Sequence, residues 1–368
     1  MTLRASKPSF NVREKLTELA VKFGLKGSEL AKAETVQDAR DLVSAGRKNK
    51  IINGAMMIDQ RHSGSSHTNS NGYHTDRFRS QVYALDQLVQ TYQQVADGPP
   101  GFTNSLKITT TTPETSVDSN EYLSVYNKME GYDLQDLAYG SDYAKPVTIS
   151  FYVKSSITGT FGFGIYRQEA AGDRQVNFTY TIDNPNVWER KSITIAGDTT
   201  RTISLTSTSG PWWNCWHLMS GTNYEGNLSP TWETYSTTNW VGYEITDAVC
   251  TTNGATWQIT GVQLEVGKNA TEFEHRHYAE ELKLCERYYE YSSAGTGRFY
   301  TIRNDGISRG TVTWRTVKRA TPNSVTLTHS NPSGWSSATV LGKDRYGMDF
   351  GSSGNYSNFA SYACDAEL

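Results

Sequence analysis

The sequence predicts a mainly β protein built around an antiparallel β-sandwich of the jelly-roll type. Aromatic residues make up 12% of the 368 residues, with 22 tyrosines, whereas charged residues make up only 20%. Between residues 82 and 266, short runs recur in which apolar and polar residues alternate, as in strands that bury one face. Turn-forming stretches such as DGPPG and TIDNPN separate these runs. We therefore expect residues 51–272 to form one jelly-roll domain.

Residues 1–50 have a different pattern and are expected to form short amphipathic helices. Asn11 is a candidate N-cap, and Gly24 is a candidate C-cap. A set of helices this short buries little surface by itself, so it needs a second surface to pack on. We expect that surface to belong to another protein; the alternative is packing on the chain's own β-domain. The apolar face of the first helix, and hence the candidate attachment surface, consists of Val12, Leu16, Leu19 and Phe23.

The stretch from Trp257 to Tyr291 changes from strand to helix periodicity. Apolar residues alternate up to Val266, and from Tyr278 onward they fall at helical spacing between charged residues. We expect a last strand of the sandwich, then a linking helix within residues 273–292. Residues 293–368 again show short strand-like runs and are expected to form a small C-terminal β tip domain.

Two stretches resemble virion structural proteins of tailed bacteriophages. The first spans residues 257–289 and contains W-x-I-T-G-V-Q-L-E-V-G, A-T-x-F-E-H-R and E-L-x-L-C-x-R-Y-Y; the second, residues 13–49, resembles the N-terminal module of cyanophage-type structural proteins. The resemblance implies a tail fibre or appendage that attaches to another virion protein through residues 1–50. It also implies a homotrimer that is assembled in the host cytoplasm and released by lysis.

The run PVTISFYVKSS, followed at a distance by W-x-I-T-G-V-Q-L-E, resembles jelly rolls of the carbohydrate-binding-module type. This implies contact with a host surface polysaccharide, and sugar rings present C–H faces on which Trp and Tyr can stack. The alternative is that these rings fill the inside of the sandwich. The candidate glycan-binding residues are Trp212, Trp213, Trp216, Tyr224 and Trp232 in one loop-rich stretch with many aromatic residues, and Trp335, Tyr346 and Tyr356 in the tip domain.

Such jelly rolls often hold a structural calcium ion, although no cofactor is expected otherwise. Calcium takes carboxylate and carbonyl oxygens. The candidate ligands are Asp59, Asp76, Asp247 and Glu265. His62, His67 and His74 have spacings unsuited to a metal site, so we expect them in an exposed polar loop.

Several classes of function are excluded or disfavoured by the sequence. The net charge is -3 and no basic stripe alternates with aromatics, which argues against nucleic-acid binding. No apolar run is long enough for membrane insertion, and the N-terminus lacks a signal-peptide core. Catalytic motifs such as G-x-S-x-G, a Walker loop and HExxH are missing, so we expect no enzyme activity. Two alternatives stay open, a decoration or connector protein and a glycan depolymerase.

We also expect free, buried thiols at Cys215, Cys250, Cys285 and Cys364.

Overall fold

The computed structural model describes residues 48–241, 244–292, 299–302, 308–329, 336–352 and 356–367. The attachment surface predicted at Val12, Leu16, Leu19 and Phe23 lies outside these residues, as does Trp335. No helix in the described ranges is both long and apolar enough to cross a membrane.

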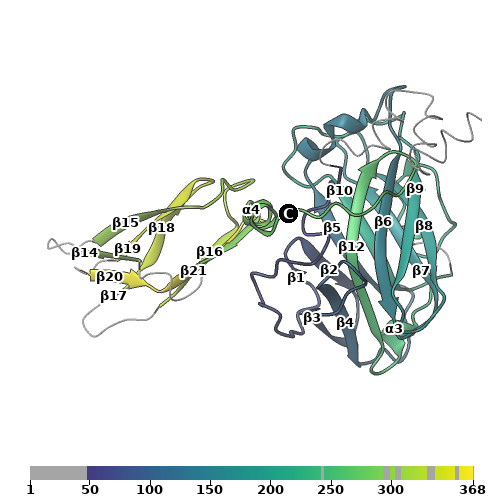
Figure 1. Cartoon of the computed structure of the whole chain (residues 1–368), viewed down its shortest axis with the longest axis horizontal. Coiled ribbons are helices and arrows are strands. Elements are labelled where there is room, and N and C mark those ends of the chain that lie inside the picture. The colour runs from purple at the N-terminus through teal and green to yellow at the C-terminus, as the bar shows by residue number, and fades with distance from the viewer. Residues whose placement is uncertain are drawn as a thin grey trace, which may run out of the picture.

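Two antiparallel sheets pack face to face and form a β-sandwich (Figure 1). The chain alternates between the sheets as it proceeds, so most strands that are neighbours in a sheet are not consecutive in sequence. The seven-stranded sheet has the order β1 (Tyr73–Thr75), β2 (Phe78–Tyr83), β5 (Tyr122–Met129), β10 (Trp212–Ser220), β7 (Gly159–Arg167), β8 (Arg174–Ile182) and β11 (Glu233–Thr234). The five-stranded sheet has the order β3 (Val89–Val95), β4 (Ser105–Thr112), β12 (Thr256–Val266), β6 (Val147–Ser155) and β9 (Glu189–Ile195). Short helical turns lie in the connections, namely η1 (Gly131–Leu137), η2 (Thr237–Asn239) and α3 (Ala248–Thr251).

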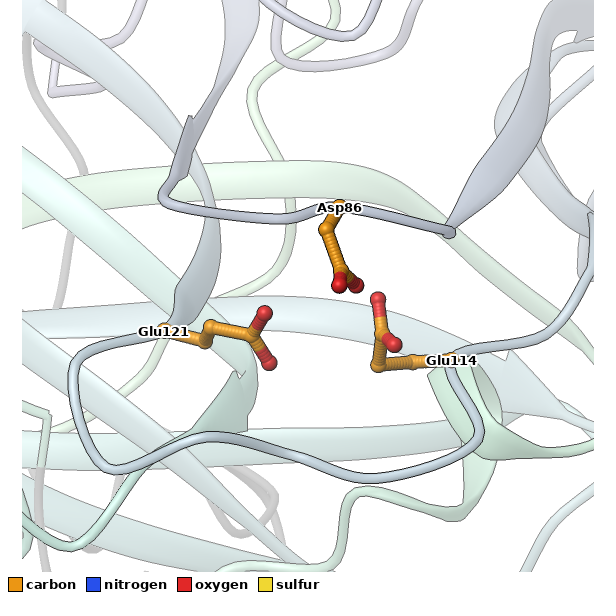
Figure 2. A group of neighbouring side chains, drawn as sticks. All are labelled: Asp86, Glu114 and Glu121. Atoms are coloured by element: carbon orange, nitrogen blue, oxygen red, sulfur yellow. The ribbon is translucent and has the colours of Figure 1, made fainter.

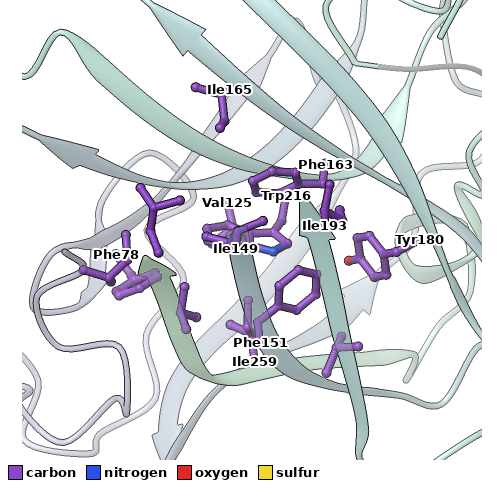
Figure 3. Close-up of a cluster of buried hydrophobic side chains, with 14 of the residues drawn as sticks. Phe78, Val125, Ile149, Phe151, Phe163, Ile165, Tyr180, Ile193, Trp216 and Ile259 are labelled. Atoms are coloured by element: carbon purple, nitrogen blue, oxygen red, sulfur yellow. The ribbon is translucent and has the colours of Figure 1, made fainter. Parts of the chain in front are cut away.

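The core lies between the two sheets because alternate side chains of each strand point inward. Figure 3 shows Phe78, Phe163 and Trp216 from the seven-stranded sheet meeting Phe151 and Ile259 from the other sheet. The Phe151 ring meets Trp216 edge-on with centroids 5.7 Å apart, which is a favourable arrangement for two aromatic rings. The predicted fold class, mainly β with an antiparallel sandwich, is confirmed.

The second body begins after the linking helix α4 (Tyr278–Glu286) and extends away from the sandwich (Figure 1). Its strands form three small sheets around a separate core that includes Trp314, Phe350 and Tyr362. The sheets are β13 (Tyr289–Tyr291), β21 (Ser361–Asp365) and β16 (Ser324–Thr328); β14 (Phe299–Ile302), β20 (Tyr356–Phe359) and β17 (Ser336–Ser337); and β15 (Ser308–Thr313), β19 (Gly347–Ser352) and β18 (Thr339–Lys343).

Buried ion pairs join the two bodies. Arg77, beside β2, pairs with Glu367 near the C-terminus, and both side chains are almost fully buried. Glu130 accepts hydrogen bonds from the Arg287 guanidinium at 2.8 Å and from the Tyr288 hydroxyl at 2.6 Å. Because separating such pairs would leave buried charges uncompensated, these contacts hold the tip domain on the sandwich.

The cysteines agree with the expectation from the sequence. Cys215, Cys250, Cys285 and Cys364 are all free and buried. Burial raises the pKa of each thiol, which keeps it protonated and unreactive.

Candidate functional site

Aromatic side chains gather on the outer face of the seven-stranded sheet, opposite the core. Tyr126 on β5, Trp213 on β10 and Tyr166 on β7 come from neighbouring strands and point outward by strand alternation. The Tyr126 and Trp213 rings stack with centroids 5.1 Å apart, and Tyr166 meets Trp213 edge-on at 5.3 Å. Trp213 and Tyr166 are only half-buried, so part of each ring is accessible to solvent.

Two cations lie among these rings. The Lys128 ammonium is 3.6 Å from the centroid of Trp213, and the Arg79 guanidinium is 5.4 Å from the centroid of Tyr126. Both distances fit cation–π contacts. Burial, with Arg79 close by, lowers the pKa of Lys128 to about 8.

The segment that follows β10 covers the other end of this face. Trp240 and Val241 pack over β7 and His217, and a Cβ at Gly162 would lie 2.5 Å from the Val241 carbonyl oxygen. Only glycine therefore allows this close approach. Tyr83 on β2 remains 51% exposed and stacks on Tyr122, with ring centroids 5.7 Å apart.

The aromatic residues predicted from the sequence divide between the two faces of the sheet. Trp213 and Tyr224 belong to the outer cluster. Trp212 and Trp216 lie in the core with no exposed surface, so their prediction as glycan-binding residues is wrong, and the alternative of core packing holds for them. Trp232 is half-buried at the sheet edge, with its ring 5.7 Å from that of Trp212.

In the tip domain, the candidate residues lie in a different body from the outer-face cluster. Tyr346 is 61% exposed and sits at the turn before β19. Tyr356 begins β20, and its side chain is not among those described.

Sequence reasoning missed several outer-face residues because they sit in runs that were assigned only as strands. In RSQVY, YLSVYNK and GFGIYRQ, positions that face inward alternate with positions that face outward, although the inward set includes the polar residues Ser80, Asn127 and Arg167 beside the apolar ones. An aromatic or cationic residue at these outward-facing positions is the sequence signal that could have identified the outer-face residues. The missed residues are Arg79, Tyr83, Tyr126, Lys128 and Tyr166.

The proposed calcium ligands do not come together. Asp59 accepts backbone N–H groups of His62 and Gly64, whereas Glu265 is bonded to Thr271. Asp76 and Asp247 likewise have separate partners, Gln60 and Ser220 respectively.

Three other carboxylates do come together, on the connections between strands. They belong to Asp86, Glu114 and Glu121 (Figure 2). Their oxygen atoms lie within 4.8 Å of one another, and within the described ranges no ion pair neutralises them. Oxygen donors of this kind suit calcium. Burial, reinforced by the neighbouring carboxylates, raises the pKa of Glu121. Backbone N–H groups of Leu88 and Asp118 already bond Glu114 and Glu121, so hydrogen bonding accounts for their burial and we assign no ion.

The three histidines do not lie in an exposed loop as expected. His62 and His67 stack with ring centroids 3.7 Å apart, and His74 stacks on Tyr92 at 3.8 Å. His74 is completely buried, and burial lowers its pKa well below the usual value. The rings therefore form a stacked column that packs β1 against β3.

No protein-family model and no curated protein matches this sequence. Among solved structures, the enzymatically active domain of tailspike protein 4 from bacteriophage CBA120 matches 60% of this chain at 11% identity, with a TM-score of 0.31. This chain spans only 21% of that tailspike chain.

Two carbohydrate-binding modules also match. The family 11 module of the cellulosomal cellulase Lic26A-Cel5E from Clostridium thermocellum matches 58% of this chain and 99% of its own, at 11% identity and a TM-score of 0.27. The CBM22-2 xylan-binding domain of Paenibacillus barcinonensis Xyn10C matches 55% of this chain and 98% of its own, at 11% identity and a TM-score of 0.27. Identities and TM-scores this low carry no argument about what this chain binds.

Proposed function

We propose that the protein binds a glycan on the outer face of the seven-stranded sheet. The observation that carries this proposal is the pair of half-buried rings, Trp213 and Tyr166, set beside polar side chains on the same face. An apolar sugar face can pack on the rings while Gln81, Arg79 and Lys128 supply hydrogen-bond donors to the hydroxyl groups.

We propose further that this binding serves a virion protein of a tailed phage, without enzyme activity. The sequence blocks at residues 13–49 and 257–289 support this setting through their resemblance to phage structural proteins. The tip domain, held out from the sandwich by buried ion pairs, suits an elongated fibre or appendage (Figure 1). In this proposal the fibre is a homotrimer, and residues 1–50 attach it to another virion protein.

The glycan proposal is tested by measuring binding of the full chain to a polysaccharide panel and to host cells. Trp213→Ala should weaken binding by about 10- to 100-fold, the loss expected when an aromatic side chain no longer covers apolar surface. Tyr143→Ala is the matched control, because Tyr143 is 83% exposed and lies outside the aromatic cluster.

Three outcomes would contradict the proposal as stated. Firm binding to virion parts with none to any glycan or host cell would favour a decoration or connector protein. Loss of binding with Tyr346→Ala but not with Trp213→Ala would move the site to the tip domain. Release of new sugar ends from the polysaccharide would establish a depolymerase instead.

The trimer is tested separately by light scattering on the full chain. A mass of three chains is expected. A monomer at all concentrations would contradict a free-standing trimeric fibre and leave the glycan site as a separate question.

A further inference from the structure

We infer that the glycan is anionic, so that its carboxylate or other acidic groups meet Arg79 and Lys128 on the outer face. This inference rests on the proposed function, because it names the class of ligand for the same site. If the face bound only neutral glycans, this inference would be wrong while the proposed function would still hold.

The two cations have no carboxylate partner among the described residues. In the part of the chain that the structure describes, no Asp or Glu lies within ion-pair distance of Arg79 or Lys128. Elsewhere in the same sheet, Arg167 on β7 pairs with Asp198 at 2.7 Å and with Glu169 at 3.0 Å, and Arg77 pairs with Glu367. The fold therefore compensates buried arginines at other places, but not the cations of the outer face.

The missing compensation is visible in the hydrogen bonds of Arg79. One of its terminal nitrogens donates to the Asn71 carbonyl oxygen at 3.0 Å. Its buried Nε has no acceptor among the residues that the structure describes. A buried donor without an acceptor costs free energy, and an acidic ligand at this point would remove that cost.

Positive charge is concentrated around these two residues. Lys128 and Arg79 both lie over the ring of Tyr126, at 5.6 and 5.4 Å from its centroid. Arg319, and Arg77 despite its pairing with Glu367, are also close enough to disfavour the charged form of Lys128. Holding several cations together at a half-buried position costs free energy through desolvation and mutual repulsion. Cation–π contacts with the aromatic rings offset only part of this cost. An anion is the ligand that removes the remainder.

The position of the ammonium of Lys128 favours an acidic sugar over a neutral one. Because Nζ lies 3.6 Å from the centroid of Trp213, a neutral sugar that stacked on this face of the ring would displace the ammonium and gain nothing from its charge. An acidic sugar gains an ion pair with Lys128 while its apolar face packs on the exposed parts of Trp213 and Tyr166. The Trp213 ring and the Lys128 ammonium are thus adjacent. A uronic acid residue, which carries a carboxylate on its sugar ring, can contact both.

A single-stranded nucleic acid also combines anions with rings, but the chain as a whole argues against it. Its net charge is -3, and the outer-face patch consists of two unpaired cations. Sequence-independent binding of single strands uses a basic groove that follows the backbone over several nucleotides. We therefore assign the patch to an acidic polysaccharide.

The test compares polymers that differ only in charge. Polygalacturonate is matched with its fully methyl-esterified form, and dextran sulfate with dextran, all against the full chain. We expect the acidic polymer of a pair to bind at least about tenfold more tightly than the neutral one, the effect of a charge-assisted contact. Lys128→Met and Arg79→Met should each weaken binding of the acidic polymer much more than binding of the neutral one, and so remove most of that preference.

Lys107→Met is the matched control, because Lys107 is a half-buried cation on β4 of the other sheet and its removal changes the net charge equally. Thermal unfolding of each variant by circular dichroism verifies that it is folded. Equal or tighter binding of the neutral polymers overturns this inference and leaves the proposed function standing. Failure of every polymer to bind overturns the proposed function itself. Tighter binding of an oligothymidylate than of any acidic polymer overturns the assignment to a glycan.

Discussion

The two faces of the seven-stranded sheet use the same residue types for opposite purposes. Trp212 and Trp213 are consecutive in sequence, yet Trp212 has no exposed surface and Trp213 lies half-buried on the outer face. Strand alternation alone separates them, because successive side chains of a strand point to opposite faces. The inner face is a closed aromatic core, whereas the outer face leaves ring surface and unpaired charge in reach of solvent.

The same contrast holds for the cations. Arg77 and Arg79 are two residues apart, but Arg77 is buried against Glu367 and Arg79 has no carboxylate partner among the described residues. A paired, buried arginine holds two bodies together. An arginine that lacks such a partner is more costly to the fold, which agrees with the binding role that we propose for Arg79.

The largest expected effect concerns the core. Trp216→Ala should lower the free energy of unfolding by about 3–5 kcal/mol, because it removes a fully buried aromatic side chain and leaves a cavity. Trp213→Ala should lower it by less than about 1.5 kcal/mol, since its ring is already partly exposed. Urea unfolding of the full chain measures both, and equal losses would contradict the assignment of the two faces.

A similar loss is expected at the junction between the bodies. Glu367→Gln should cost about 3–5 kcal/mol, because it removes the partner of the buried Arg77. Lys128→Met should be neutral or slightly stabilising, since it removes a half-buried charge that no carboxylate compensates. If denaturant unfolding shows that Lys128→Met destabilises the protein as much as Glu367→Gln, then Lys128 has a structural role that we have not recognised.

The smallest effect is a dependence of binding on pH. Lys128, with a pKa of about 8, is cationic below that pH and neutral above it. Acidic glycan should therefore bind several-fold more weakly at pH 9 than at pH 7, as expected when one charge-assisted contact is lost. The thiol of Cys215, which also faces Lys128, stays protonated because burial raises its pKa.

The pH profile of polygalacturonate binding measures this effect, because the carboxylates of the polymer stay ionised over the range. Lys128→Met should remove the dependence. The same profile in wild type and variant would show that another group is responsible.

The strands and the sandwich could be predicted from the sequence because the alternation of apolar and polar residues along a strand is a local property. The aromatic-rich stretch was expected to be rich in loops, but its first part, Trp212–Ser220, forms β10 between β5 and β7. The sequence could not separate Trp213 from Trp212 and Trp216 as outward and inward residues, since that requires knowing which face of the strand meets the other sheet. Arg79 and Lys128 could not be predicted as parts of the site from the sequence, for a related reason. Their meeting at Tyr126 depends on the pairing of β2 with β5 across more than forty residues of chain. The column of His62, His67 and His74 likewise forms only when β1 packs against β3.

The most direct measurement is a crystal structure of the full chain with an oligosaccharide of the glycan that binds most tightly. We expect the sugar on the outer face of the seven-stranded sheet, in contact with the ring of Trp213 and with an acidic group near Lys128 and Arg79. A sugar bound at the tip domain, or on the five-stranded sheet with the outer face unoccupied, would contradict the assignment of this face as the glycan-binding site.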